Sequence, residues 1–272
     1  MKIELQKLLK ETTELAGEWK TNWIGESIFC YETIDSTNLQ AKRLSQEGCK
    51  NGTLVVAECQ EAGRGRRGRS WESPLGTNIS MSLLLKPEIE PNHASMITLV
   101  TALAVAKAIS KLTGKRADIK WPNDIVMNGK KICGILTEMS LQSGEIEDII
   151  VGIGINVNTQ QFPKEIQDIA TSIYLETGMR LSRVELIQAV WKFFEMDYEI
   201  YLQTQNLQNL VEDYNTRLVN KNRKVKVLDP NKAFEGYARG ITPYGELIVD
   251  TEEGEKLISS GEVSVRGIYG YV

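Results

Sequence analysis

The sequence predicts an α+β fold in which a mixed or antiparallel sheet is flanked by helices and followed by a small β-barrel. Strand-like apolar runs and helical segments share the first 221 residues, as in a domain built from both elements. The pair Asn128-Gly129 lies between two short apolar runs and is typical of a tight turn that joins antiparallel strands. From Arg223 onward only short strand-like segments occur, separated by glycine turns, and this pattern is typical of a small barrel.

The N-terminal half begins with residues 3–16, whose leucines at helical spacing predict an amphipathic helix. Residues 35–38 are capping types ahead of a second helix, which Gly48 ends. A long apolar helix is expected over residues 95–111, with Gly114 as its stop. The strands expected in this half span residues 27–31, 53–59, 78–85 and 118–121.

The C-terminal half continues the large domain and changes character near Asn222. Ser182 and Glu185 have capping-box spacing and open an aromatic-rich helix to about Tyr201, and another helix is expected over residues 207–218. Strands are expected at residues 125–127, 131–136, 149–156, 225–227, 235–238, 247–249, 256–258 and 263–265. The chain is therefore expected to divide into a helical lead-in (1–26), a large domain (27–221) and a C-terminal barrel (222–272).

The overall charge and the histidine count exclude several classes of protein. Lysine and arginine total 32 against 36 acidic residues, so the net charge is −4 and any anion-binding patch must be local. A Ser-His-Asp triad or a histidine zinc site would have to use the single histidine, His93. This residue precedes an apolar helical stretch, where a solvated loop or helix-start position is expected. Histidine-based hydrolysis and multi-histidine metal chemistry are therefore not expected.

The cysteines and the N-terminus indicate a reduced, cytoplasmic compartment. The four cysteines are 19, 10 and 74 residues apart and include no Cys-x-x-Cys pair, which argues against a zinc site or a disulfide scaffold. Charged residues recur through the first turns of the chain, so neither a signal peptide nor a membrane-spanning helix is expected there.

A loop rich in glycine and arginine follows the second expected strand. Residues 63–69 hold four arginines and three glycines, and Trp71 follows them. Glycine allows a backbone to approach a ligand closely, and arginine offers a fixed fork of donors to carboxylate or phosphate. The loop can thus close over an anionic ligand. A solvated basic turn and an RNA-contacting segment are the alternatives, the latter weakened because aromatic residues are limited to Trp71.

A second polar group, residues 120–124 (Lys-Trp-Pro-Asn-Asp), lies where a strand ends. The proline fixes a bend, after which Asn123 and Asp124 present polar groups of the kind that contact ligands or magnesium. A plain turn is the alternative. Lys131 begins the strand after the Asn128-Gly129 turn, so its backbone is anchored, although an exposed lysine there is commonly only solvated.

Gly152, Gly154 and Asn156 alternate in an expected strand and should therefore face one side of it. Two glycines in that arrangement leave a bare backbone shelf on which a flat ring could lie. The chain has neither the dinucleotide fingerprint nor a Gly-x-x-x-x-Gly-Lys-Ser/Thr loop. A nucleotide, if one binds, is therefore bound without a Walker loop.

In their order along the chain, these motifs resemble those of the biotin protein ligase family. They cover residues 27–160, from Asp35-Ser36-Thr37-Asn38 through the glycine-arginine loop to Gly152-Ile153-Gly154-Ile155-Asn156, and residues 261–266 fit that family's small barrel. The resemblance implies a fold like that of class II aminoacyl-tRNA synthetases, with an SH3-like barrel at the C-terminus. It assigns the binding of biotin and ATP, and the catalysis, to residues 27–221.

The resemblance implies a two-step reaction that needs no covalent enzyme intermediate. The biotin carboxylate attacks the α-phosphate of MgATP to give biotinyl-5′-AMP, which then acylates a lysine of a biotin carboxyl carrier domain, for example that of acetyl-CoA carboxylase. Because the first nucleophile is already an anion at pH 7, the protein mainly positions the reactants and neutralises phosphate charge. This agrees with the presence of a single histidine.

The same resemblance implies roles for individual residues. Lys131 and Arg66 are implied to be catalytic, and Asp124 is the implied magnesium ligand. The implied biotin-side residues are Ser36, Thr37, Asn38, Gln60, Arg64, Gly65, Arg66, Lys131 and Gly134. The implied ATP-side or adenylate-side residues are Gly63, Arg67, Arg69, Trp71, Asn123, Asp124, Gly152, Gly154 and Asn156.

The N-terminus departs from one branch of the resembled family, whose members carry a DNA-binding winged-helix domain. Only 34 residues precede Asp35, fewer than the roughly 50 that a small domain needs, so a ligase without DNA binding is expected. A homodimer is possible in the resembled family. The alternatives in function are a lipoate-protein ligase, which shares the fold and the adenylation chemistry, and, more distantly, an RNA-binding protein that uses the arginine-rich loop.

Overall fold

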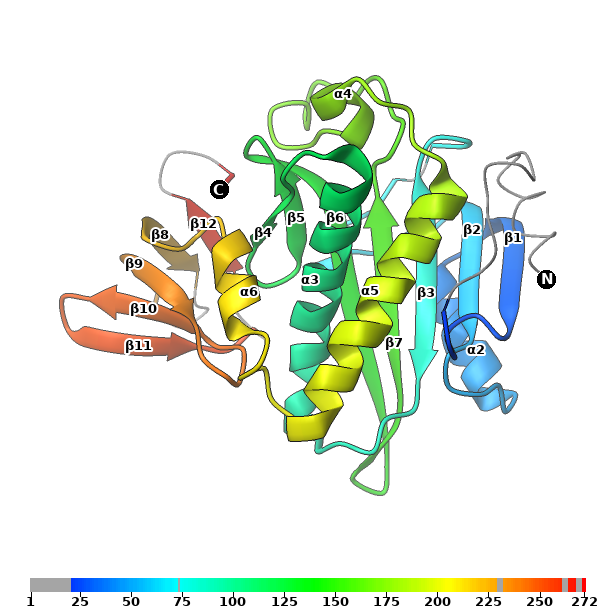
Figure 1. Ribbon diagram of the computed structural model, residues 1–272, viewed down its shortest axis with the longest axis horizontal. Coiled ribbons are helices and arrows are strands. Elements are labelled where there is room, and N and C mark those ends of the chain that lie inside the picture. The colour runs from blue at the N-terminus through cyan, green and yellow to red at the C-terminus, as the bar shows by residue number, and fades with distance from the viewer. Residues whose placement is uncertain (1–20, 73, 229–231, 261–263, 268–270) are drawn as a thin grey trace.

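A seven-stranded mixed sheet forms the centre of the computed structural model (Figure 1), which describes residues 21–272 except 73, 229–231, 261–263 and 268–270. The helix expected over residues 3–16 lies outside the described residues. The strand order is β1-β2-β3-β7-β6-β5-β4; β1 and β2 run parallel, and every other neighbouring pair runs antiparallel. The strands are β1 (Ile28–Ile34), β2 (Leu54–Gln60), β3 (Ile79–Leu85), β4 (Asp118–Lys120), β5 (Asp124–Met127), β6 (Lys130–Gln142) and β7 (Glu145–Ile155).

Helices cover both faces of this sheet, as the predicted fold class requires. Helices α3 (Ala94–Thr113) and α5 (Arg183–Thr204) pack together across one face (Figure 1). Helix α2 (Thr37–Gln46) packs with Val55, Leu84 and Ile150 in a small separate cluster. Their neighbours in the strands belong to the main core, so the alternation of each strand assigns α2 to the opposite face. The sheet is therefore the middle of three layers.

Helix α3 is the apolar segment predicted from the sequence, and it ends where Gly114 takes up the left-handed conformation at φ 64°. The segment Pro91–Thr113 is long and apolar enough to cross a membrane by composition, but 72% of its apolar window is buried inside the fold. It is thus packed as a core helix. The short 3-10 turn η2 (Pro91–His93) precedes it, and His93 is half-buried beside Tyr244 at the start of the helix.

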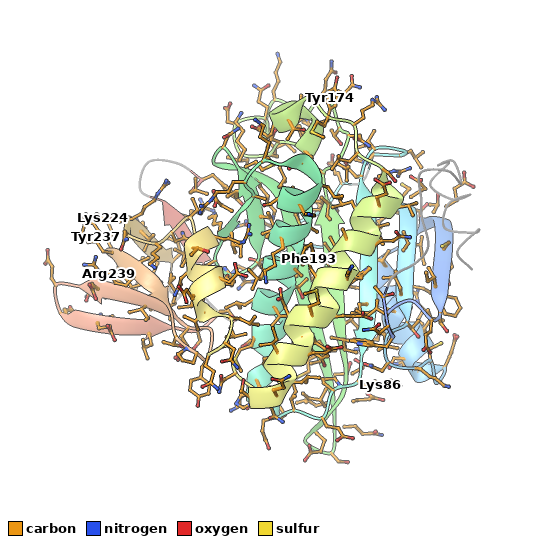
Figure 2. The ribbon with its side chains drawn as sticks, in the orientation of Figure 1. Lys86, Tyr174, Phe193, Lys224, Tyr237 and Arg239 are labelled. Carbon is orange, nitrogen blue, oxygen red and sulfur yellow. The ribbon has the colours of Figure 1, made fainter. Side chains whose placement is uncertain are left out.

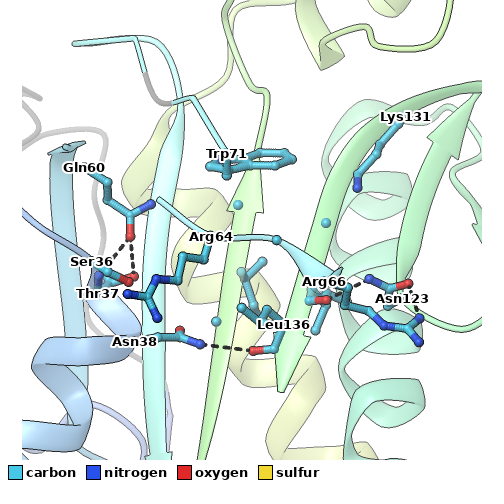
Figure 3. A pocket seen from close by; sticks show the side chains of 16 residues that line it. Ser36, Thr37, Asn38, Gln60, Arg64, Arg66, Trp71, Asn123, Lys131 and Leu136 are labelled. Carbon is cyan, nitrogen blue, oxygen red and sulfur yellow. Dashed lines mark hydrogen bonds between the residues drawn. The ribbon is translucent and has the colours of Figure 1, made fainter. Parts of the chain in front are cut away.

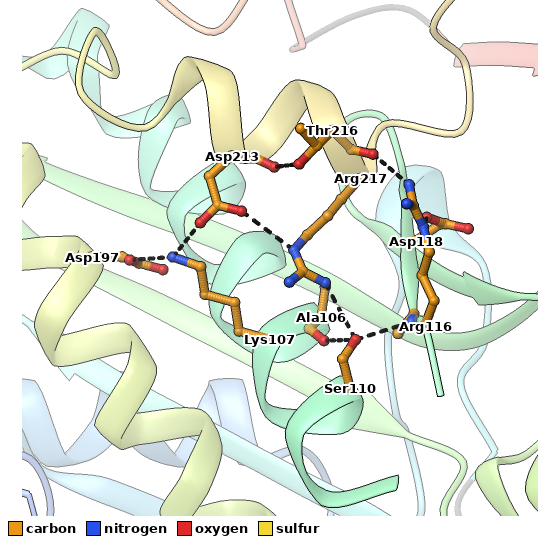
Figure 4. A network of polar contacts seen from close by, with 10 residues as sticks. Ala106, Lys107, Ser110, Arg116, Asp118, Asp197, Asp213, Thr216 and Arg217 are labelled. Atoms are coloured by element: carbon orange, nitrogen blue, oxygen red, sulfur yellow. Dashed lines mark hydrogen bonds and ion pairs between the residues drawn. The ribbon is translucent and has the colours of Figure 1, made fainter. Parts of the chain in front are cut away.

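Helix α5 begins as its sequence predicts, because the Ser182 side chain accepts a hydrogen bond from the Glu185 backbone at 3.1 Å. The next helix, α6 (Val211–Arg217), is shorter than expected. A polar network ties it to the core (Figure 4): Lys107 of α3 forms ion pairs with Asp197 of α5 at 2.8 Å and with Asp213 of α6 at 2.7 Å. A short helix absent from the prediction, α4 (Ile173–Thr177), follows the central strands.

The C-terminal segments form a second, five-stranded antiparallel sheet of order β11-β10-β9-β8-β12. Its strands are β8 (Arg223–Leu228), β9 (Phe234–Ile241), β10 (Leu247–Thr251), β11 (Gly254–Ile258) and β12 (Ser264–Gly267). The Trp121 indole of the large domain donates to the Gly245 carbonyl at 3.0 Å, and residues of both sheets share one hydrophobic cluster. The small sheet is thus packed firmly against the large one; the domain limits at 26 and 221 stay a prediction.

Candidate active site

A pocket opens over the middle strands of the large sheet, between the start of α2 and the hairpin of β5 and β6. Figure 3 shows two ends, which we call the neutral end and the charged end. At the neutral end lie the polar side chains of Ser36, Thr37, Asn38 and Gln60, with the Arg64 side chain extending toward them, and at the charged end lie Lys131, Arg66 and Asn123. The residues that line it are Ser36, Thr37, Asn38, Gln60, Arg64, Gly65, Arg66, Trp71, Asn123, Lys131, Gly134, Ile135, Leu136, Gly152, Ile153 and Gly154. Segments nearly 120 residues apart in the sequence therefore meet in one site.

The neutral end of the pocket is a chain of hydrogen bonds. Gln60 Oε1 accepts from the Thr37 backbone N–H at 2.8 Å and from its hydroxyl at 3.0 Å. Buried Ser82 donates toward Thr37 Oγ1 at 2.7 Å and lies 2.6 Å from Asn38 Oδ1. Ser36 is the N-cap residue of α2 but its side chain makes no capping bond, so its hydroxyl is not committed to the helix. This end can present hydroxyl and amide groups to an uncharged polar ligand.

The glycine-arginine loop folds back on itself at the mouth of the pocket. Trp71 N–H donates to the Gly63 carbonyl at 2.9 Å, and Gly65 N–H donates to the Arg69 carbonyl at 2.7 Å. A Cβ at Gly63 would overlap the Trp71 carbonyl, so this closure requires glycine there. Inside the loop lies the 3-10 turn η1 (Arg66–Gly68), in which Arg67 has a φ of 58°. The loop is thus an ordered hairpin that presents Arg64, Gly65 and Arg66 to the pocket.

Arg66 links this loop to two other parts of the chain. Its guanidinium donates to Asn123 Oδ1 at 3.0 Å and to the Ser260 carbonyl of the C-terminal unit. Burial lowers the pKa of Arg66, and Asp124 partly offsets that effect. The guanidinium therefore lies fixed and partly desolvated at the charged end of the pocket, where its attraction for an anion is stronger than in water.

Trp71 occupies the glycine shelf that the sequence predicted to be bare. A Cβ at Gly154 would overlap the Trp71 indole, and a Cβ at Gly152 would overlap the Asn38 side chain. The two glycines do face one side, but side chains of this chain already lie over both, so the expectation of a bare shelf is wrong. The indole Nε1 is buried without a hydrogen-bond partner among the described residues. A buried N–H of this kind is a donor available to a ligand.

Lys131 lies at the centre of the charged end. Its ammonium is 2.6 Å from Asp124 Oδ1 and 5.6 Å from the centre of the Trp71 ring. A Cβ at Gly134 would be 2.9 Å from Lys131 Nζ, so the glycine leaves the space that the lysine side chain fills. Burial works to raise the pKa of Asp124, but the charge and hydrogen bond of Lys131 and a hydrogen bond from Tyr271 outweigh it and lower that pKa. Asp124 is therefore ionised and paired.

Two residues that sequence reasoning left without a role complete this charged end. Lys120 is buried, and burial lowers its pKa to about 8 against the opposing pull of Asp124. Tyr271, near the end of the chain, donates its hydroxyl to Asp124 Oδ2 and lies under Lys120 Nζ at 3.5 Å from the ring centre. No local pattern identifies Tyr271, because its partners are about 150 residues earlier in the sequence.

Comparison with known proteins gives a family for this arrangement. The model of the "Biotin/lipoate A/B protein ligase family" matches residues 30–156, and that of the "Biotin protein ligase C terminal domain" matches residues 222–266. The chain is 40% identical to the bifunctional ligase/repressor BirA of Bacillus spizizenii over 93% of its own length and 78% of that protein. The chain belongs to the biotin protein ligase family. As a member of that family, it is a ligase.

Two further relatives agree with this assignment. The biotin--[acetyl-CoA-carboxylase] ligase of Paracoccus denitrificans is 31% identical over 86% of this chain and 98% of that protein. A solved structure of the biotin protein ligase from Aquifex aeolicus in complex with biotin and ATP superposes with a TM-score of 0.79. It is 32% identical and covers 89% of this chain and 99% of its own.

The pocket of this biotin protein ligase brings together most of the residues predicted from the sequence. All nine biotin-side residues line it, and so do four of the adenylate-side residues, Trp71, Asn123, Gly152 and Gly154. Asp124 lies directly behind the lining through its ion pair with Lys131. The side chains of Arg67 and Arg69 are exposed on the loop, and Gly63 closes the loop without lining the pocket.

Asn156 lies outside the lining and has structural partners. It is buried, its Oδ1 accepts from Asn78 at 3.2 Å, and its Nδ2 donates to the Thr171 carbonyl at 3.1 Å. Its side chain thus joins the end of β7 to the segment that leads into α4. His93 is likewise not among the lining residues, as the sequence led us to expect.

Proposed function

We propose that this pocket performs both steps of protein biotinylation. In the first step a biotin carboxylate oxygen attacks the α-phosphorus of ATP, and the bond to pyrophosphate breaks. In the second step a lysine amine of a biotin carboxyl carrier domain attacks the acyl carbon of biotinyl-5′-AMP, AMP leaves, and the amine loses a proton. The observation that carries the proposal is the meeting of all nine biotin-side residues with Trp71 and Asn123 in one pocket.

Lys131 and Arg66 are the electrostatic catalysts in this proposal. Both line the charged end of the pocket, Lys131 with its ammonium turned toward the pocket and Arg66 with its guanidinium held by Asn123 (Figure 3), and we place the carboxylate and the α-phosphate there. The attacking carboxylate is ionised at neutral pH without help, so the barrier comes mainly from bringing two anions together. Fixed cations that face the developing charge lower this barrier and need no proton transfer.

The neutral end of the pocket fits the uncharged head of biotin. Ser36, Thr37, Asn38 and Gln60 provide hydroxyl and amide groups of both donor and acceptor type. The Arg64-Gly65 backbone then lies over the bound molecule, with the Trp71 indole beyond it. The unpartnered Nε1 of Trp71 is suited to an acceptor on the adenylate.

Magnesium is expected to accompany ATP, but the described residues do not present an open ligand set. They include no group of three or more histidine, cysteine or acidic side chains that could hold a metal ion. Asp124 already engages Lys131 through one oxygen and Tyr271 through the other. Asp124 as a magnesium ligand therefore stays a prediction that requires one of these partners to withdraw, and no step is assigned through the ion.

The protein that accepts biotin and the cellular location of the reaction are also part of this proposal. The acceptor is a biotin carboxyl carrier domain of acetyl-CoA carboxylase or a related carboxylase, in keeping with the name of the relative from Paracoccus denitrificans. We further propose a cytoplasmic location with no membrane association and no DNA binding by this chain.

Lipoate ligation is the nearest alternative. The first family model covers biotin and lipoate ligases alike, but the match at residues 222–266 is to a domain of biotin protein ligases. The RNA-binding alternative is disfavoured because Arg64 and Arg66 line the pocket with the neutral polar residues.

The deciding experiment incubates the protein with ATP, an apo carrier domain and either labelled biotin or labelled lipoate. We expect biotin-dependent release of pyrophosphate and label on the carrier domain only with biotin. Transfer of lipoate alone would replace the proposal with the lipoate alternative. Absence of pyrophosphate release with either acid would overturn adenylation altogether.

A further inference from the structure

Tyr271 joins the C-terminal segment to the charged end of the pocket. Its hydroxyl donates to Asp124 Oδ2, while Asp124 Oδ1 is paired with Lys131. Burial, Asp124 and the hydrogen bond between them all raise the pKa of Tyr271, so the hydroxyl keeps its proton and remains a donor. One carboxylate is therefore held from both sides, by a cation of the large sheet and by a tyrosine from outside it.

The Lys131 ammonium has its place set by this carboxylate. Asp124 of β5 lies opposite Gly134 of β6, and Gly134 is three residues beyond Lys131. The ion pair between Lys131 and Asp124 therefore runs diagonally between the strands, past this glycine. The glycine provides space but no contact that would restrain a long, flexible side chain. Whatever fixes Asp124 thus also fixes the position of the Lys131 charge.

The ring of Tyr271 has a second role beside Lys120. Lys120 Nζ lies 3.5 Å from the ring centre, close enough for a cation–π contact. Lys120 is buried and its charge is disfavoured by burial, so a stacked aromatic face offsets part of that cost. The same side chain therefore serves both lysines of the charged end.

Val272, which follows Tyr271, contacts both sheets. Val272 lies against the β5–β6 turn, where a Cβ at Gly129 would be 3.2 Å from its side chain. On the other side, the Val272 backbone lies close enough to Gly267 of β12 that a Cβ there would overlap it. Arg66 meets the same unit through the Ser260 carbonyl. The C-terminal unit thus contacts both proposed catalytic cations, one directly and one through Asp124.

We propose that Tyr271 is a positioning residue for adenylate formation: it holds Asp124 so that Lys131 keeps its charge at the reacting groups. The inference rests on the proposed function. Without the hydroxyl, Asp124 Oδ2 has a free lone pair in a buried site and draws an ammonium toward it. Lys131 then forms a closer, two-oxygen pair with Asp124 and moves away from the phosphate.

Two substitutions separate the parts played by the hydroxyl and the ring. In Tyr271→Phe only the hydroxyl is lost, and we expect kcat for biotin-dependent ATP–pyrophosphate exchange to fall about tenfold, the scale of one charged hydrogen bond. The KM for biotin stays within about twofold, because the neutral end is untouched. Tyr271→Leu also removes the face under Lys120, so the KM for ATP rises as well.

Tyr237→Phe is the matched control, since Tyr237 lies half-exposed on β9 of the small sheet (Figure 2) and does not line the pocket. Its exchange kinetics should equal those of the wild type. Thermal unfolding of each variant shows whether a loss of exchange activity follows from misfolding. If Tyr271→Leu does not fold, the result for Tyr271→Phe alone tests the inference.

A double-mutant cycle tests whether Tyr271 acts through Asp124. In an Asp124→Asn background, Tyr271→Phe should cost less than twofold, because the carboxylate that it positions is gone. The inference would be overturned if Tyr271→Phe lowered kcat by the same factor in the Asp124→Asn background as in the wild type. A Tyr271→Phe kcat equal to that of the wild type would also overturn it. A wild-type protein without biotin-dependent exchange would instead refute the proposed function, so the two failures are distinguishable.

Discussion

The two ends of the pocket are held together in different ways. At the neutral end, Thr37 hydrogen-bonds directly to Gln60 and to buried Ser82, and these three residues belong to neighbouring elements of one sheet and one helix. The charged end collects Arg66, Lys131 and Asp124 from separate segments, and two of its contacts come from the C-terminal unit. Recognition is thus local to the large sheet, whereas the charges depend on contacts across the whole molecule.

This difference follows from the chemistry each end performs. Neutral donors and acceptors satisfy one another in a compact network that the core already supports. Cations that stay close together in a partly buried site repel one another and need a counter-charge and fixed neighbours. Asp124 provides that counter-charge, and the C-terminal contacts restrain it. Substitutions at the two ends should therefore change different kinetic parameters.

The largest effect is expected for Lys131→Ala, which removes the central cation. Adenylate formation should fall by a factor of about 100 to 1,000, the scale of losing one donor aimed at developing charge. The fold should survive because the pairing of β6 with β5 and β7 does not involve this side chain. Pyrophosphate release measures the loss, and Lys130→Ala, one position earlier, is the control. Wild-type rates in Lys131→Ala would remove this residue from the mechanism.

The two shelf glycines provide a paired test of the two ends. In Gly154→Ala the new methyl group displaces Trp71, and in Gly152→Ala it displaces Asn38. Such overpacking costs about 1–3 kcal/mol. We expect Gly154→Ala to raise mainly the KM for ATP and Gly152→Ala mainly the KM for biotin, each by about tenfold or more. Equal effects of both variants on both substrates would contradict the division of the pocket.

Arg66→Ala should weaken retention of the intermediate. The guanidinium joins the loop to Asn123 and to Ser260, so its loss leaves the loop free to open over biotinyl-5′-AMP. Dissociation of the intermediate should become faster by about tenfold, the scale of one charged hydrogen bond. Arg67→Ala, whose exposed side chain does not line the pocket, should change it far less. Unchanged dissociation from Arg66→Ala would count against closure by this residue.

The sequence predicted the local parts of this site well. The strand-to-helix transition at Ser36, the ordered turn at Asn128-Gly129 and the anchored Lys131 all depend on short-range preferences, and the structure confirms each of them. The strand run from Lys131 was expected to stop at residue 136 but continues to Gln142, because pairing with β7 stabilises its polar end.

What could not be predicted are the contacts between distant segments. Trp71 lies over Gly154, and Tyr271 reaches Asp124, across 83 and 147 positions of chain. Asn156 has the residue type and spacing of a ligand-binding amide, yet its side chain joins Asn78 to Thr171. Residue type and spacing identify which groups can bind a ligand, whereas the folded partners decide which of them do.

The smallest predicted effect is a pH dependence at the charged end, where ATP binding and protein stability should change in opposite directions. The pKa of Lys120 is lowered to about 8, chiefly by burial, with Asp124 opposing the shift and Lys131, Arg266 and Arg69 adding to it. As the pH rises through 8, one positive charge disappears from the charged end, next to Asp124 and Lys131. The KM for ATP should therefore rise a few-fold between about pH 7 and pH 9, with little change in the KM for biotin.

Stability should respond to the same titration with the opposite sign. Between pH 8 and the ordinary lysine pKa of 10.5, the unfolded chain holds a proton that the folded Lys120 has released, so this group's contribution to the free energy of unfolding increases with pH. Lys120→Met keeps much of the apolar stem without the charge and should flatten both profiles. If the pH dependence of ATP binding persists in Lys120→Met, another group of the charged end is responsible for it.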